Sequence, residues 1–140
     1  MEILFLLSAF VLGSFPTGVV VARAKGIDLR KVGSGNIGTT NVGPALGRRW
    51  AAFVLLVDAG KGALPVLLAG YLFPSPWLAA AAGFSAVLGQ VFSIFLKGRG
   101  GKGVATSLGA GLALAPLPAL GPAALWIVLM LTFRISSVGS

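Results

Sequence analysis

The sequence predicts an all-α fold: a polytopic bundle of helices integral to a membrane, in one domain covering residues 1–140. Composition is the first reason. Hydrophobic residues make up 56% of the chain and charged residues only 10%, whereas soluble domains carry about 25% charged residues. The second reason is that apolar residues gather in long stretches, separated by short polar or Gly/Pro-rich segments. These stretches cover residues 2–22, 51–73, 77–96, 104–115 and 119–133.

We expect one helix from each stretch, five in all. The first three approach the length of about 20 residues that a helix needs to cross the hydrocarbon core, whereas the last two are short and are expected to span it only in part. The first stretch is interpreted as a retained span, because it lacks the basic residues that open a signal peptide. Pro16 lies inside it and is expected to kink the helix.

Orientation follows from Lys and Arg, which stay on the cytoplasmic side when they lie in short loops. Residues 23–49 and 97–102 are rich in these cations, and the turns at 74–76 and 116–122 have none. We therefore expect a multi-pass protein of the inner (plasma) membrane. Its N-terminus would lie outside, and its basic segments would form irregular or re-entrant loops that face the cytoplasm.

Composition also limits the chemistry. The chain has no cysteine and no histidine, which excludes disulfides and thiolate metal sites and removes the commonest general base. We expect neither a metal nor an organic cofactor. The net charge is +8, but there is no basic amphipathic helix and the aromatic residues lie in apolar stretches, so no nucleic acid partner is expected. An anionic small substrate, or the anionic leaflet, explains the charge better.

Two basic segments carry the groups suited to such an anion. Residues 31–42, KVGSGNIGTTNV, interleave glycine with small hydroxyl and amide side chains, which bring many donors close together. Residues 98–106, GRGGKGVAT, end where a helix is expected to begin, so N-terminal N–H groups can assist Lys102 in holding phosphate. They are not a nucleotide P-loop, because Leu96 and Gly103 break that motif. A solvated loop and a basic turn that only sets orientation remain the alternatives.

Four ordered blocks of the sequence carry a resemblance to one family. They are 13–18 (GSFPTG), 33–41 (GSGNIGTTN), 58–62 (DAGKG) and 100–106 (GGKGVAT). In their order and spacing, from residue 3 to residue 140, the chain resembles the bacterial membrane glycerol-3-phosphate acyltransferases that use acyl phosphate as donor. The resemblance implies attack of the 1-hydroxyl of glycerol 3-phosphate on the acyl phosphate carbonyl, which gives 1-acylglycerol 3-phosphate, or lysophosphatidate, for phospholipid synthesis.

The resemblance also implies which residues serve the reaction. Lys102 and Ser34 are the expected catalytic residues. The residues expected to bind substrate are Asn36, Thr40, Asn41, Gly100, Gly101, Gly103, Thr106, Arg134, Ser137 and Ser140. The partners would be acyl phosphate, glycerol 3-phosphate and the lipid bilayer. No covalent enzyme intermediate is required, since acyl phosphate is already activated.

Asp58 and Lys61 are ionisable residues inside an apolar stretch, and such residues are candidates for function by default. Their spacing of three places them on one face of a helix, where each can neutralise the other. We favour a mutual pair buried against other helices over direct catalysis.

The sequence departs from the family pattern at several positions. Pro44 stands where an arginine is usual, and Gln90 stands where a histidine is usual before the glycine-rich loop. The family pattern continues past Ser140 with further helices and a block containing histidine, so we expect residues 1–140 to form an incomplete family domain. The alternative function is a non-catalytic membrane protein of the same descent that binds or carries an anion or a phosphate ester.

Overall fold

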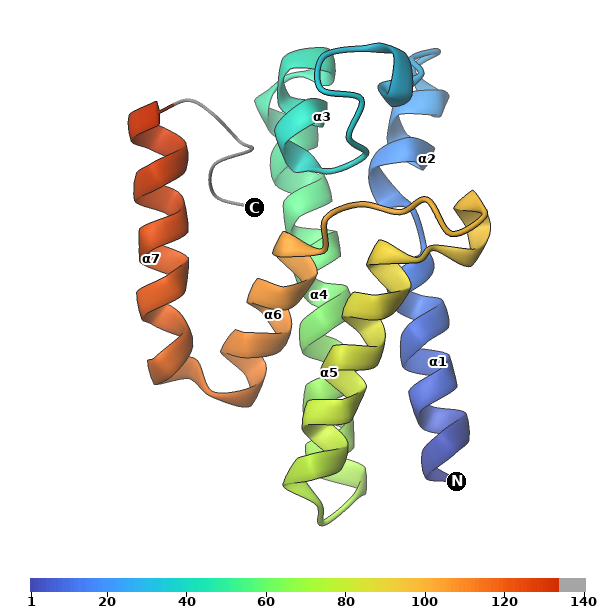
Figure 1. Cartoon of the computed structure of the whole chain (residues 1–140), viewed down its shortest axis with the longest axis vertical. Helices are drawn as coiled ribbons and strands as arrows, with labels where there is room; N and C mark the ends of the chain where they lie inside the picture. Colours follow the sequence, from blue (N-terminus) through green and yellow to red (C-terminus); the bar gives the residue numbers. More distant parts are fainter. Residues whose placement is uncertain (134–140) are drawn as a thin grey trace.

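The computed structural model describes residues 1–133, with side chains described through Val128, and this part of the chain is helical with no β-strand (Figure 1). The α-helices are α1 (Glu2–Ser14), α2 (Thr17–Ala24), α3 (Thr39–Leu46), α4 (Arg48–Leu72), α5 (Pro76–Val91), α6 (Val104–Leu114) and α7 (Pro116–Phe133). Two short 3-10 helices are η1 (Leu29–Lys31) and η2 (Ile94–Leu96). Arg134, Ser137 and Ser140, expected to bind substrate, lie outside the described residues.

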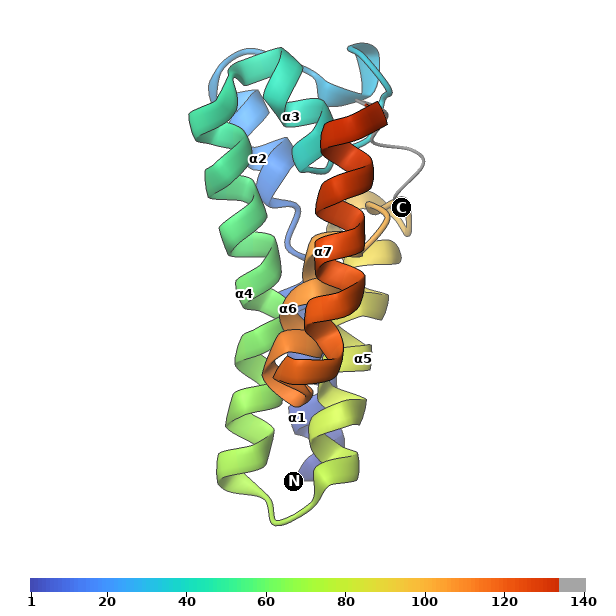
Figure 2. The same ribbon diagram turned by 90° about the vertical axis from the view of Figure 1, so that its left-hand side faces the viewer.

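The predicted membrane bundle is confirmed. Among the described residues, three segments are long and apolar enough to cross a membrane by length and composition, namely Glu2–Ala24, Arg48–Leu72 and Pro76–Leu96, with mean hydropathies of 2.1, 1.8 and 1.8. The two shorter apolar helices follow them in the chain. Figures 1 and 2 show α4 running the length of the bundle, with α6 and α7 forming a hairpin beside it.

Pro16 does more than kink the first span, because α1 ends at Ser14 and α2 begins at Thr17. Proline has no N–H to continue a helix, and within a bilayer each backbone group freed by such a break needs a partner inside the protein. The Ser93 hydroxyl donates to the Ser14 carbonyl at 2.5 Å, and the Lys61 ammonium donates to the carbonyl of Phe15. Side chains of α4 and of the segment after α5 therefore stabilise the break.

The segment between α2 and α4 contains a short helix where a loop was expected. Helix α3 has eight residues and includes Pro44. Gly47, at φ 95°, joins it directly to α4, a backbone conformation that only glycine adopts readily. In Figure 1 this segment lies at the opposite end of the bundle from the N-terminus and the α4–α5 turn.

Glycine sets the distance between α4 and α6. A Cβ at Gly62 would lie 2.0 Å from the Thr106 carbonyl oxygen, and a Cβ at Gly109 would lie 1.9 Å from that of Ala59. These helices touch along their backbones, as small residues permit in membrane bundles. The first turn of α6 is thereby fixed against the middle of α4.

Candidate active site

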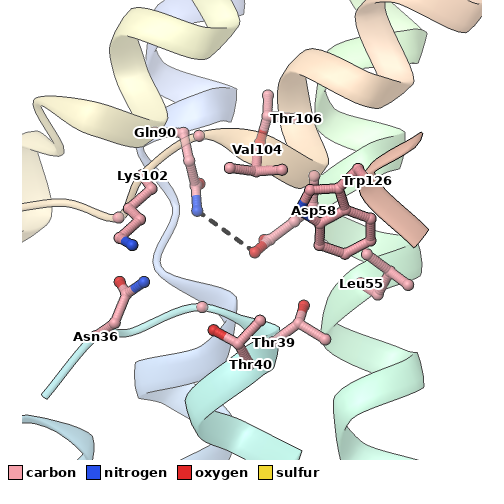
Figure 3. A pocket seen from close by; sticks show the side chains of 14 residues that line it. Asn36, Thr39, Thr40, Leu55, Asp58, Gln90, Lys102, Val104, Thr106 and Trp126 are labelled. Atoms are coloured by element: carbon pink, nitrogen blue, oxygen red, sulfur yellow. Dashed lines mark hydrogen bonds between the residues drawn. The ribbon is translucent and has the colours of Figure 1, made fainter. Parts of the chain in front are cut away.

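A small cavity lies between the segment that leads into α3 and the segment that leads into α6 (Figure 3). Its volume is about 50 Å³. The residues that line it are Asn36, Gly38, Thr39, Thr40, Leu55, Asp58, Gln90, Gly101, Lys102, Gly103, Val104, Ala105, Thr106 and Trp126. Both segments were predicted to hold anions, and the structure brings them together across about 60 residues of sequence.

The glycine-rich loop forms one wall. The N–H groups of Gly100 and Gly101 donate to the carbonyls of Val91 and Gln90, both at 2.9 Å. This pairing requires glycine at position 100, because a Cβ there would lie 2.1 Å from the Gln90 oxygen. Lys102 enters the cavity from this loop (Figure 3).

The first turn of α6 continues this wall. Its N-cap is Gly103, at φ 76°, which has no side chain to cap the helix. Residues 103–106 all line the cavity. The N-terminal N–H groups of a helix attract anions. The positive end of α6 therefore lies at the cavity beside Lys102.

Helix α3 presents a second positive end to the same cavity. Gly38 is its N-cap, also without a side-chain capping bond, and Gly38, Thr39 and Thr40 line the cavity. The side-chain oxygens of Thr39 and Thr106, one from each helix start, are buried and make no hydrogen bond with the described part of the protein. Buried polar groups normally have partners, so both are suited to a polar ligand.

Asn41 is placed differently from the expectation, because it does not line the cavity. Its side chain is 2% exposed and donates to the carbonyls of Leu29, Val32 and Asn36 at 2.9–3.0 Å. Its oxygen accepts from the Ser34 N–H at 3.1 Å. The structure thus shows Asn41 holding the loop that precedes α3 in shape.

Ser34 and Gly100 also lie outside the cavity lining. Ser34 is exposed, and its Oγ accepts a long hydrogen bond of 3.5 Å from the N–H of Asn36. Of the described residues expected in the site, six line the cavity: Asn36, Thr40, Gly101, Lys102, Gly103 and Thr106.

The predicted buried pair is confirmed. Lys61 Nζ lies 2.6 Å from Asp58 Oδ1, and both side chains are 4% exposed. Asp58 also lines the cavity, together with Gln90 of α5, a placement that the sequence did not predict. Polar side chains inside apolar stretches were the signal for both residues, since a bilayer helix retains such groups where they face the bundle interior.

A larger groove adjoins the cavity, between α6 and α7. Its volume is about 490 Å³. Lys102, Val104 and Trp126 line both spaces, and the rest of the groove is mostly apolar, with Leu108 and Pro122 among its residues. The arrangement joins a small polar cavity to a groove suited to a hydrocarbon chain.

Comparisons with known proteins place the chain in a family. The sequence model described as glycerol-3-phosphate acyltransferase matches residues 3–140. A glycerol-3-phosphate acyltransferase of Rubrobacter xylanophilus is 51% identical over 140 residues, covering 100% of this chain and 70% of the relative. One from Thermus thermophilus is 49% identical over 135 residues, covering 96% of this chain and 68% of the relative.

Solved structures of a glycerol 3-phosphate acyltransferase also match the chain. The crystal structure of PlsY (YgiH), an integral membrane glycerol 3-phosphate acyltransferase, in its glycerol 3-phosphate form matches with a TM-score of 0.91 and 40% identity, covering 99% of this chain and 70% of that one. Its lysophosphatidic acid form matches with a TM-score of 0.88 and 38% identity, with 99% and 69% covered. The motif order, the helical membrane fold and these matches lead to one conclusion: the chain belongs to the glycerol-3-phosphate acyltransferase family.

Proposed function

We propose that this chain transfers an acyl group from acyl phosphate to the 1-hydroxyl of glycerol 3-phosphate, the step that yields 1-acylglycerol 3-phosphate for phospholipid synthesis. The bond between the acyl carbon and the phosphate oxygen breaks, and an ester bond to the hydroxyl oxygen forms. The hydroxyl proton leaves with inorganic phosphate. Family membership supports the proposal, as do the forms in which the related PlsY was crystallised.

The observation that carries the proposal is the meeting of two helix starts at one cavity. The first turns of α3 and α6 line it together with Lys102. N–H groups at helix starts and an ammonium group are the donors that hold phosphate. The buried hydroxyls of Thr39 and Thr106 would add two further donors to phosphate oxygens.

The groove between α6 and α7 is our choice for the acyl chain of the donor. It shares Lys102, Val104 and Trp126 with the cavity, so a chain lying in the groove would bring its acyl phosphate group to Lys102.

In catalysis, Lys102 would stabilise the charge that develops on the leaving phosphate. Donors fixed in place before the reaction lower the barrier because they need no reorganisation. The catalytic role of Ser34 stays a prediction. Its hydroxyl lies outside the cavity lining, so a direct role requires residues 32–38 to move inward when substrate binds.

We further propose that the protein lies in the inner membrane and that the cavity opens on its cytoplasmic side. The α2–α4 segment and the glycine-rich loop carry Lys and Arg, whereas the α4–α5 and α6–α7 turns carry none. Basic residues in short loops mark the cytoplasmic side. Cysteines introduced at Ser34 and Ser107 should therefore both react with a reagent added from the cytoplasmic side.

Donor choice tests the proposed function. The purified protein in lipid nanodiscs would receive labelled glycerol 3-phosphate with palmitoyl phosphate, palmitoyl-CoA or palmitoyl acyl carrier protein. We expect lysophosphatidate and phosphate only with acyl phosphate, because the cavity is small and its glycine-rich loop lacks the nucleotide P-loop pattern. Equal or better use of acyl-CoA would overturn the donor assignment. Binding of glycerol 3-phosphate without product from any donor would favour the non-catalytic alternative.

A further inference from the structure

Three side chains at the centre of the bundle form a closed polar cluster that the proposed function leaves without a role. Asp58, Lys61 and Gln90 are 3%, 4% and 6% exposed. Lys61 Nζ donates to Asp58 Oδ1 at 2.6 Å and to Gln90 Oε1 at 3.4 Å. Gln90 Nε2 donates to Asp58 Oδ2 at 3.4 Å. Both oxygens of the carboxylate therefore accept a bond inside the cluster.

The members of this cluster differ in their relation to the cavity. Asp58 and Gln90 line it, and Lys61 does not. In Figure 3 the Gln90 amide points at the Asp58 carboxylate, and Lys102 is drawn on the side of Gln90 away from Asp58. A carboxylate thus borders a cavity otherwise suited to a phosphate dianion. An uncompensated negative charge there would repel the phosphate strongly, because charges interact more strongly in a partly buried site than in water.

Lys61 is held where it can cancel that charge without entering the cavity. Besides Asp58 and Gln90, its ammonium group donates to the Phe15 carbonyl at the break between α1 and α2. A lysine ammonium group has three N–H donors, so it can donate one hydrogen bond to each of these three acceptors. The broken first span therefore supplies the third acceptor for Lys61.

We propose that Lys61 is a positioning residue for anion binding. It neutralises Asp58, so that the Asp58–Gln90 side of the cavity accepts a phosphate group instead of repelling it. The inference rests on the proposed function in assuming that the cavity takes a phosphate ester. It adds an electrostatic role for a buried pair that would otherwise only hold helices together.

Opposite charge changes distinguish this role from a structural one. Lys61→Met leaves the Asp58 charge uncompensated and should weaken binding of glycerol 3-phosphate about tenfold or more. Asp58→Asn leaves the Lys61 charge in excess and should bind glycerol 3-phosphate as tightly as the unchanged protein or more tightly. The double variant removes both charges and should return to within about threefold of the unchanged protein. A purely structural pair predicts that both single variants lose affinity.

Binding would be measured by titration calorimetry of the whole chain in nanodiscs with glycerol 3-phosphate and, separately, inorganic phosphate. Thermal unfolding followed by circular dichroism would report stability for each variant. Ser85→Ala is the matched control, because Ser85 donates to the Leu6 carbonyl between α1 and α5 at 2.7 Å and carries no charge. It should lower stability and leave affinity unchanged.

Weaker binding by Asp58→Asn, or unchanged binding by Lys61→Met, would overturn the inference. If Lys61→Met does not fold, Asp58→Asn still tests the inference, because the inference excludes a weaker affinity of that variant for glycerol 3-phosphate. Failure of the unchanged protein to bind either anion would overturn the proposed function itself, and the inference with it.

Discussion

The two walls of the cavity are held in place by different means. The wall that leads into α3 depends on one side chain, since Asn41 makes four hydrogen bonds that shape residues 29–36. The wall that leads into α6 depends on backbone pairing and on the absence of side chains at Gly100, Gly62 and Gly109. Removal of the Asn41 side chain should therefore disrupt the first wall, whereas addition of a side chain at one of these glycines should disrupt the second.

Asn41→Ala should have the largest effect, since it breaks the first wall. It removes the hydrogen bonds to the carbonyls of Leu29, Val32 and Asn36 and to the N–H of Ser34. The Val32 carbonyl keeps its bond from the Gly35 N–H, but a buried polar group left unpaired, such as the Leu29 carbonyl, costs about 1–3 kcal/mol. We expect loss of glycerol 3-phosphate binding and a fall in the unfolding temperature. Asn41→Asp keeps the acceptor for Ser34 but loses the donors, so wild-type behaviour of that variant would contradict the account.

Gly100→Ala tests the second wall by adding a single methyl group. The new Cβ would lie 2.1 Å and 2.5 Å from the carbonyl oxygens of Gln90 and Val91, so the loop must move away from α5. Overpacking of this kind costs about 1–3 kcal/mol, and the displaced loop should raise the KM for glycerol 3-phosphate. Gly60→Ala is the matched control, since nothing lies within 4 Å of its added Cβ. Equal effects of the two substitutions would contradict the packing argument.

Lys102→Ala removes a charged donor from the cavity. Loss of a charged hydrogen bond to substrate costs about 1.5–3 kcal/mol, which is roughly ten- to a hundredfold in affinity or rate. Ser34→Ala is expected to impair the same step if its predicted role is correct. Steady-state rates of phosphate release would give kcat and KM. Lys97 is an exposed cation on the same segment and lies outside the cavity. Lys97→Gln should therefore change neither kcat nor KM.

Arg30→Ala should have the smallest effect and sharpens the comparison, because Arg30 connects the two walls. Its Nη2 donates to the Arg99 carbonyl at 2.5 Å across 69 residues of sequence, in an exposed position. A typical hydrogen bond contributes about 0.5–1.5 kcal/mol, so a KM change of severalfold with unchanged kcat is expected. A loss as large as that of Asn41→Ala would show that the walls depend on each other.

The fold was predictable from hydropathy to a large extent, and the site less so. Long apolar runs locate α4 and α5 because bilayer thickness sets helix length. Helix α3 was missed because its start, within GSGNIGTTN, combines glycine and short polar residues that favour loops when taken alone. Tertiary packing of Val42, which is fully buried against Ala22, Leu29 and Val54, overrides that local preference.

The roles of individual polar residues were the hardest to predict. Asn36 and Asn41 lie five residues apart in one motif, yet one lines the cavity and the other holds the loop. An asparagine offers the same donors and acceptors in both roles. Asp58 and Lys61 were easier to assign as a pair, because an unpaired charge inside a bilayer is costly.

The position of the cavity along α4 has an electrical consequence. Asp58 is the eleventh residue of α4, about 15 Å from its start at Arg48. With the proposed orientation, a phosphate dianion entering from the cytoplasm crosses part of the transmembrane field, toward the positive outer side. A full crossing is worth about 2.3 kcal/mol per charge for each 100 mV. A respiring cell should therefore draw glycerol 3-phosphate into this site, and imposing an inside-negative potential on vesicles should lower its KM. An unchanged KM would place the cavity outside the field.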